Sequence, residues 1–225
     1  MNSKIKLLVI AIMVVSFFAS CNNDTTTTSE NKKDNSTSET SIAAKDTMNN
    51  MDNKSMANNL MTSMNSMMDK MKNMKMTGDF DIDFANMMIE HHQTAIDMSE
   101  QEVSSGKDDK IKSMAQNIIT SQKEEIIKLR DFVKTYKASG MKHGEGELQK
   151  SMSDMESKMK NMQTIGDMDK DFAMMMIEHH ESAVSMSKKQ LTNGMSEKLK
   201  QMARKMITDQ NKEIKEFKAW LDSKK

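Results

Sequence analysis

Residues 87–99 read MMIEHHQTAIDMS, and residues 175–187 read MMIEHHESAVSMS. The second copy begins 88 residues after the first (175 minus 87), and this offset holds without a gap from about residue 60 to residue 136. A repeat of this quality indicates that one structural unit occurs twice in the chain. The sequence contains no proline, and its seven glycines stand between segments of helical periodicity. These features predict an all-α fold of helices joined by short turns.

Each copy predicts three helices: a methionine-rich helix, a motif helix that carries the paired histidines, and a long third helix. Their expected ranges are about 55–75, 80–105 and 108–137 in the first copy, and 146–162, 168–192 and 196–223 in the second. We therefore expect one bundle domain, in which repeat 1 is residues 55–140 and repeat 2 is residues 141–225.

The N-terminus has the pattern of a bacterial lipoprotein signal peptide over residues 1–20. An apolar run from Leu7 to Phe18 follows two lysines, and small residues then lead to Cys21, the only cysteine. The run is too short to span a membrane comfortably. We expect Cys21 to be lipidated and to anchor the protein in the cell envelope, facing the periplasm or the cell exterior; an ordinary signal peptide is the alternative. Residues 21–54 are polar and predict a disordered tether.

The charge balance and the cysteine count exclude several classes of function. The chain has 33 basic and 33 acidic side chains, which gives no electrostatic basis for nucleic-acid binding. With Cys21 lipidated, no thiol remains for a disulfide, for thiolate catalysis or for a cysteine metal site in a monomer.

The histidines lie on the apolar side of the motif helix. Winding this helix at about 100° per residue places His91 and His92 in one apolar arc with the neighbouring methionines, and His179 and His180 do the same. Imidazole beside thioether favours a transition metal, with copper as the leading candidate. The two motifs form either one shared site or two separate sites. The structural alternative is a core of hydrogen-bonded histidines and of methionines that fill space.

The third helices carry polar residues in an otherwise apolar seam. These residues are Gln122 and Glu125 in repeat 1, and Gln210 and Glu213 in repeat 2. A buried carboxylate is costly without a partner. Because the short turn near Gly106 makes the two helices antiparallel, we expect His91 and His92 to face Gln122 and Glu125, with the same arrangement in the second repeat.

The methionine-rich helices have a heptad-like stripe that predicts a core-facing seam. Met64, Met67, Met71 and Met74 lie on this stripe, and Met152, Met155, Met159 and Met162 mirror them. Methionines off the stripe or upstream of it are freer to bind Cu(I) or Ag(I); they are Met48, Met51, Met56, Met61 and Met68.

The motif segments resemble the domain-of-unknown-function 305 family. The stretches that show this resemblance are DFANMMIEHHQTAIDMS with AQNIITSQKEEI, and DFAMMMIEHHESAVSMS with ARKMITDQNKEI. They cover about residues 79–136 and 167–224. Members have a duplicated M-I-x-H-H-x-x-A-x-x-M helix followed by a Q-x-x-E helix, and the resemblance implies a ferritin-like helical bundle. Some members bind copper in the bacterial envelope. The ligands that this resemblance implies are Met88, His91, His92, Met98, Met176, His179, His180 and Met186.

The leading hypothesis is an envelope protein that binds Cu(I) or Cu(II) for sequestration, delivery or resistance, and that is not an enzyme. Further candidate ligands are Met87, Met175, Met48, Met51, Met56 and Met61, and candidate outer-shell residues are Gln122, Glu125, Gln210 and Glu213. The alternative is a structural or interaction lipoprotein whose buried His/Glu/Gln network holds no metal. A di-iron oxidase is disfavoured because no glutamate precedes a histidine by three residues.

Overall fold

The computed structural model describes residues 55, 58–138, 140, 142, 144 and 146–225. Six helices, and no strand, lie within these residues. In chain order they are a helix over residues 58–72, α2 (Phe80–Ser105), α3 (Asp109–Thr135), α4 (Glu147–Lys160), α5 (Met168–Asn193) and α6 (Glu197–Asp222). This architecture confirms the expected ferritin-like, all-α bundle of two tandem repeats.

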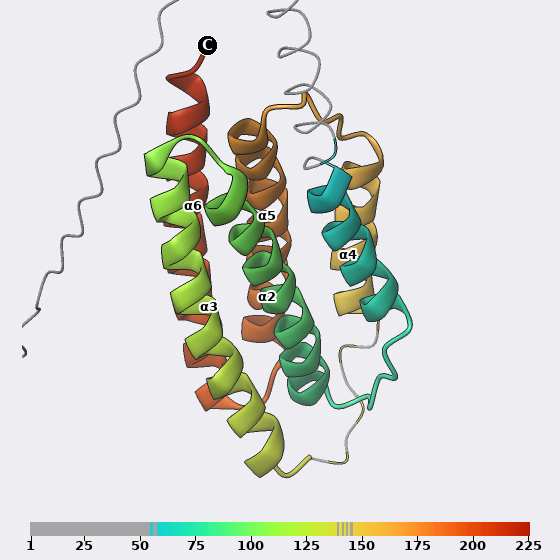
Figure 1. Cartoon of the computed structure of the whole chain (residues 1–225). Coiled ribbons are helices and arrows are strands. Elements are labelled where there is room, and N and C mark those ends of the chain that lie inside the picture. Colours follow the sequence, from blue (N-terminus) through green and yellow to red (C-terminus); the bar gives the residue numbers. More distant parts are fainter. Residues whose placement is uncertain (1–54, 56–57, 139, 141, 143, 145) are drawn as a thin grey trace, which may run out of the picture. The chain divides into compact units, whose positions relative to one another are not determined.

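The two motif helices, α2 and α5, lie in the middle of the bundle (Figure 1). Each packs along the third helix of its own repeat, α3 or α6, and the two motif helices also pack against each other. The methionine-rich helices, the teal helix over residues 58–72 and α4, lie on the other side of this central pair (Figure 1). Burial follows this arrangement, since 15 of the 26 residues of α2 are buried but only 10 of the 27 residues of α3. Polar residues of the motif helices are therefore forced into the interior.

The methionine-rich helices contribute the seam that their stripe predicts. Met64, Met67 and Met71 are buried, and Met152, Met155 and Met159 mirror them. Met74 and Met162, at the ends of the stripe, are half-buried. The methionine stripes thus cover the motif helices and complete the core. The last methionine of each stripe is partly exposed.

The same aspartate-bound turn leads into both motif helices. Gly78 and Gly166 have φ angles of 86° and 78°, a region that L side chains rarely adopt. Their backbone amides donate to Asp83 and Asp171 respectively, each at 2.9 Å. The two turns have the same structure because the glycine and the aspartate recur in the sequence at the 88-residue offset.

A second pair of aspartates joins the two repeats. Asp81, in the first turn of α2, is fully buried and accepts the backbone amides of residues 195–196, in the turn before α6, at 2.9 and 3.1 Å. Its counterpart Asp169, in α5, accepts the amides of residues 107–108, before α3, at 2.9 Å each. Each repeat thus secures a turn of the other, an arrangement that we call the aspartate clasps.

The two clasps differ in their side-chain partners. The Tyr136 hydroxyl donates to Asp81 at 3.2 Å, and its counterpart in the second repeat, residue 224, is a lysine. The side-chain amide of Gln190 donates to Asp81 in one clasp, whereas Glu102 occupies the equivalent position (102 plus 88) beside Asp169 in the other. No group in the described part of the chain donates to either carboxyl oxygen of Glu102. Burial, and next the hydrogen bond to Asp169, raise the pKa of Glu102 to about 9. Glu102 is therefore a neutral acid at pH 7, and its O–H group is the donor in the hydrogen bond to Asp169.

Several expectations fall on residues that the structure does not describe. They are the signal peptide at 1–20, lipidation of Cys21, the tether at 21–54, and metal binding by Met48, Met51 and Met56. No helix in the described ranges is both long enough and apolar enough to cross a membrane.

Candidate metal centre

The paired histidines of the two motifs meet where α2 packs against α5. His91, His92, His179 and His180 are all completely buried. The rings of His91 and His179 have centroids 3.7 Å apart and planes tilted by 39°, and the rings of His179 and His180 have centroids 6.0 Å apart. The two motifs therefore form one cluster, which we call the histidine cluster.

The outer histidine of each motif contacts a glutamate of the third helix. His92 Nε2 lies 2.8 Å from Glu125 Oε2, and His180 Nε2 lies 2.8 Å from Glu213 Oε2. Only the His92 contact has the direction of a hydrogen bond. A carboxylate can only accept, so the proton lies on Nε2 of His92 and the lone pair of this ring is on Nδ1. Carboxylates orient metal-binding histidines in this way.

The expectation that the motif histidines face the polar residues of the third helices is confirmed for His92 with Glu125 and for His180 with Glu213. The inner histidines, His91 and His179, have no hydrogen bond to Gln122 or Gln210 in the described part of the chain. Consecutive residues on a helix point about 100° apart. When His92 faces α3, His91 must turn to the opposite motif helix, where it meets His179. Gln122 and Gln210 are buried as expected, but their Oε1 atoms have no partner within the described residues.

The cluster contains many unpaired ring nitrogens. Both nitrogens of His91 and His179, and Nδ1 of His92 and His180, are buried and have no hydrogen-bond partner of acceptable geometry in the described ranges. A buried polar atom without a partner costs about 1–3 kcal/mol, and such atoms in a native protein call for an explanation such as a bound ion. A network of histidines that served only packing would satisfy these atoms. The donor set therefore fits a bound metal.

The electrostatics of the cluster keep the imidazoles in the form that binds metals. Burial, with the neighbouring histidines as the second cause, lowers the pKa of His91 and of His179 well below the ordinary value. Burial alone would raise the pKa of Glu125, but His92 and then Lys205 outweigh it and leave this pKa lowered. The cluster thus combines neutral inner imidazoles with an ionised carboxylate at its edge.

The motif methionines line the same buried face. Met88, Met98, Met176 and Met186 are all completely buried. Met88 precedes the two histidines by about one helical turn, and Met98 follows His91 by about two turns. No three His, Cys, Asp or Glu side chains of the described ranges are grouped as metal ligands.

The other candidate methionines lie in different surroundings. Met87 and Met175 are buried, but Met87 lines a separate cavity beside α4. Met61 is half-buried and packs against the core. The aspartates of the clasps were not anticipated from the sequence, although their recurrence in FDIDFA and MDKDFA, residues 80–85 and 168–173, could have marked them.

An all-α bundle of two repeats, with paired histidines and methionines on its central helices, defines the structural class of this protein. The chain belongs to the family described as "Domain of unknown function (DUF305)", whose profile matches residues 22–133 and 133–221. No functionally curated protein matches the chain.

Solved structures of similar proteins have the same helical fold. A silver-bound form of CopM, obtained by soaking, is 27% identical, with a TM-score of 0.50 over 64% of this chain and 96% of CopM. A Cu(I)-bound form of CopM is 28% identical, with a TM-score of 0.49 over the same shares. A DUF305 fragment from Deinococcus radiodurans is 18% identical, with a TM-score of 0.49 over 64% of this chain and 96% of the fragment.

Proposed function

We propose that this protein binds copper through the histidine cluster and the methionines beside it, and that it sequesters, delivers or detoxifies the ion rather than catalysing a reaction. The observation that carries this proposal is the pair of inner histidines. His91 and His179 lie in contact and are fully buried, and none of their four ring nitrogens has a hydrogen-bond partner of acceptable geometry in the described part of the chain.

The choice of copper rests on the ligand types. Thioether sulfur is a poor ligand for hard cations such as Mg²⁺ or Ca²⁺, whereas Cu(I) accepts it readily, and imidazole suits both oxidation states of copper. CopM, which shares 27% identity with this chain, has been solved with Ag(I), an ion with the same preference for soft ligands. This likeness supports a soft metal as the cargo.

The glutamates of the third helices would orient the site. Glu125 fixes the ring of His92 from outside, and Glu213 approaches His180 at the same distance. Ring nitrogens facing inward would then meet the inner histidines with little rearrangement. The carboxylates would also offset part of the charge of a bound cation.

We place this function in the cell envelope, on the basis of the N-terminal sequence. Residues 1–20 followed by Cys21 have the lipoprotein pattern. A site built from methionine and histidine suits an oxidising compartment, where cysteine ligands risk forming disulfides.

The competing proposal is a structural or interaction lipoprotein whose histidines only pack. The two proposals differ in what the inner histidines do for the protein without metal. If they are structural, their removal should destabilise the bundle. If they are ligands, their removal should leave the metal-free protein as stable or more stable, because unpaired polar atoms leave the core.

The test is a double variant, His91→Leu with His179→Leu, which replaces each ring by an apolar side chain. The measurements are Cu(II) bound per chain, helical content by circular dichroism, and urea unfolding of the metal-free protein. His143→Leu is the matched control, because it removes a histidine that belongs to neither sequence motif. We expect the double variant alone to lose Cu(II) while it keeps its helices and its stability. Retained Cu(II) together with lower stability would favour the structural role instead.

A further inference from the structure

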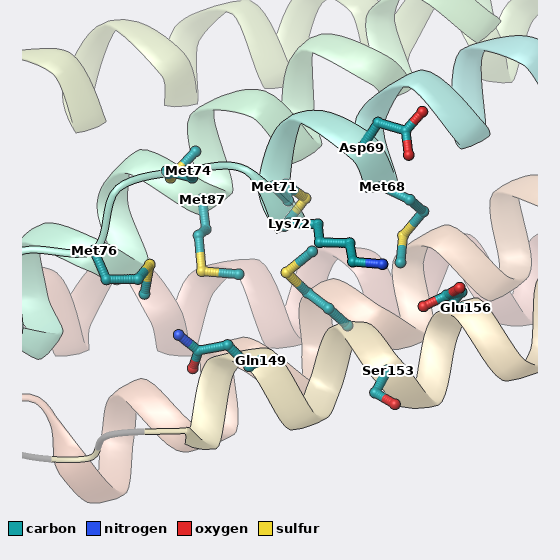
Figure 2. A pocket seen from close by; sticks show the side chains of 11 residues that line it. Met68, Asp69, Met71, Lys72, Met74, Met76, Met87, Gln149, Ser153 and Glu156 are labelled. Carbon is teal, nitrogen blue, oxygen red and sulfur yellow. The ribbon is translucent and has the colours of Figure 1, made fainter.

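A second group of methionines surrounds a cavity on the other side of α2. The cavity has a volume of about 270 Å³ and lies between the helix over residues 58–72, the segment that follows it, α2 and α4. Figure 2 shows side chains from these elements directed toward a common space. Six methionines line it: Met68, Met71, Met74, Met76, Met87 and Met152. We call this cavity the methionine pocket.

The apolar part of the pocket lining consists of one residue type. All the apolar side chains that line it are methionine, with no Leu, Ile, Val or Phe among them. The two methionine-rich helices contribute one leucine each to the described core, Leu60 and Leu148, whereas the buried face of α2 also includes Phe80 and Phe84. Methionine fills irregular gaps, but here the gap is left open, and thioethers from four segments of the chain border it.

We propose that the methionine pocket is a second metal site, which binds a soft monovalent cation such as Cu(I) or Ag(I) through thioethers alone. It extends the proposed metal binding to another place in the fold and does not rest on the histidine cluster. Cu(I) and Ag(I) are filled-shell ions that accept thioether ligands, whereas Cu(II) and Zn(II) prefer nitrogen and oxygen or thiolate.

The exposed fraction of the lining methionines decreases from the mouth of the pocket to its floor. Met71, Met87 and Met152 are 4%, 1% and 6% exposed, whereas Met74 and Met76 are half-buried. Ligands at the mouth could therefore capture an ion and pass it inward by exchange of one sulfur for another.

The charged residues of the lining favour a cation. Asp69 and Glu156 carry two negative charges and Lys72 carries one positive charge, so the lining has a formal charge of −1. None of the lining residues is a histidine or a cysteine. Without a donor that titrates between pH 5 and 8, binding here should persist under mildly acidic conditions, where imidazole sites lose metal to protons.

The two repeats differ at this pocket, which supplies a matched control. Adding 88 to the number of Met68 or Met76 gives Glu156 or Thr164, so the second repeat cannot build the same lining. Three other methionines of the pocket keep methionine counterparts in repeat 2: Met71, Met74 and Met87 correspond to Met159, Met162 and Met175.

The experiment compares two triple variants of the full chain in the background of His91→Leu with His179→Leu. The pocket variant carries Met71→Leu, Met74→Leu and Met152→Leu. The control carries their counterparts at the 88-residue offset, Met159→Leu, Met162→Leu and Met64→Leu. Leucine keeps most of the apolar volume, so both should fold. The probe is Ag(I), added as the nitrate in chloride-free buffer at pH 5.5, with bound silver measured after dialysis.

We expect the pocket variant to bind about one Ag(I) fewer per chain than the control. Cu(II) or Zn(II) should not displace Ag(I) from the pocket of the control. In protein labelled at the methionine methyl groups, Ag(I) should shift resonances that the pocket substitutions remove. If the triple variant does not fold, Met74→Leu with Met76→Leu, both half-buried, should weaken Ag(I) binding at least tenfold. Equal silver in the pocket variant and the control, or unshifted pocket resonances, would overturn the proposal.

The outcome is separable from that of the proposed function. Loss of Cu(II) in the histidine double variant tests the histidine cluster, and loss of Ag(I) in the pocket variant tests the methionine pocket. If the histidine double variant by itself lost the Ag(I) that is assigned to the pocket, the second site would not be independent and this inference would fail.

Discussion

Glu102→Gln should stabilise the protein at neutral pH, because it gives the Asp169 clasp the amide donor that Gln190 already gives the Asp81 clasp. Glu102 is fully buried beside Asp169, and its pKa is raised to about 9 from an ordinary value of 4.5. The folded protein must therefore hold a proton on Glu102 at pH 7, whereas the unfolded chain releases it. Glutamine supplies a hydrogen-bond donor without that requirement.

The size of the effect follows from linkage between protonation and folding. A raised pKa in the folded state contributes stability that is fully present below pH 4.5 and is lost as the pH rises toward about 9. Each pKa unit corresponds to about 1.4 kcal/mol, so the 2.5 units between pH 4.5 and pH 7 correspond to about 3.5 kcal/mol. Glu102→Gln should recover about this amount at pH 7, with a rise in Tm of roughly 10 °C.

The assay is urea unfolding of the metal-free protein at pH 5, 7 and 8.5, for the wild type and for Glu102→Gln. We expect the advantage of the variant to be small at pH 5 and to grow by about 1.4 kcal/mol per pH unit above it. Gln190→Glu is the matched control, since it places an acid in the other clasp and should destabilise the protein increasingly as the pH rises. If the wild type and Glu102→Gln differ by a constant amount at all three values, Glu102 is not a buried neutral acid and the reasoning fails.

Four further substitutions test other parts of the protein. Glu125→Gln should weaken Cu(II) binding by about 10–100-fold while circular dichroism stays unchanged; unchanged affinity would remove Glu125 from the site. Phe217→Ala should cost about 3–5 kcal/mol in urea unfolding, because the ring is completely buried, whereas Ile127→Ala, at a side chain that is 60% exposed, should change stability by less than about 0.5 kcal/mol. Cys21→Ala should move the protein out of the membrane fraction; a wild-type protein found soluble, with an unmodified cysteine by mass spectrometry, would contradict lipidation.

The sequence by itself determined the helices, their repetition and most of the core. The expected motif helices, 80–105 and 168–192, differ from α2 and α5 by at most one residue. Their ends could be predicted because glycine turns and aspartate caps are local signals. Burial of His91 and of the methionine stripes could also be predicted, because which residues share a helical face depends only on the 3.6-residue period.

Only the tertiary structure decided which buried groups meet. Periodicity placed His91 and His92 on one apolar arc, but the crossing of α2 and α5 turned His91 toward His179 and left His92 to Glu125. The clasp between Asp81 and residues 195–196 joins positions more than 100 residues apart, and no local pattern predicts it. The methionine pocket likewise exists because four segments leave a gap between them. Such contacts depend on how rigid helices pack against one another, and one-dimensional periodicity carries no information on that packing.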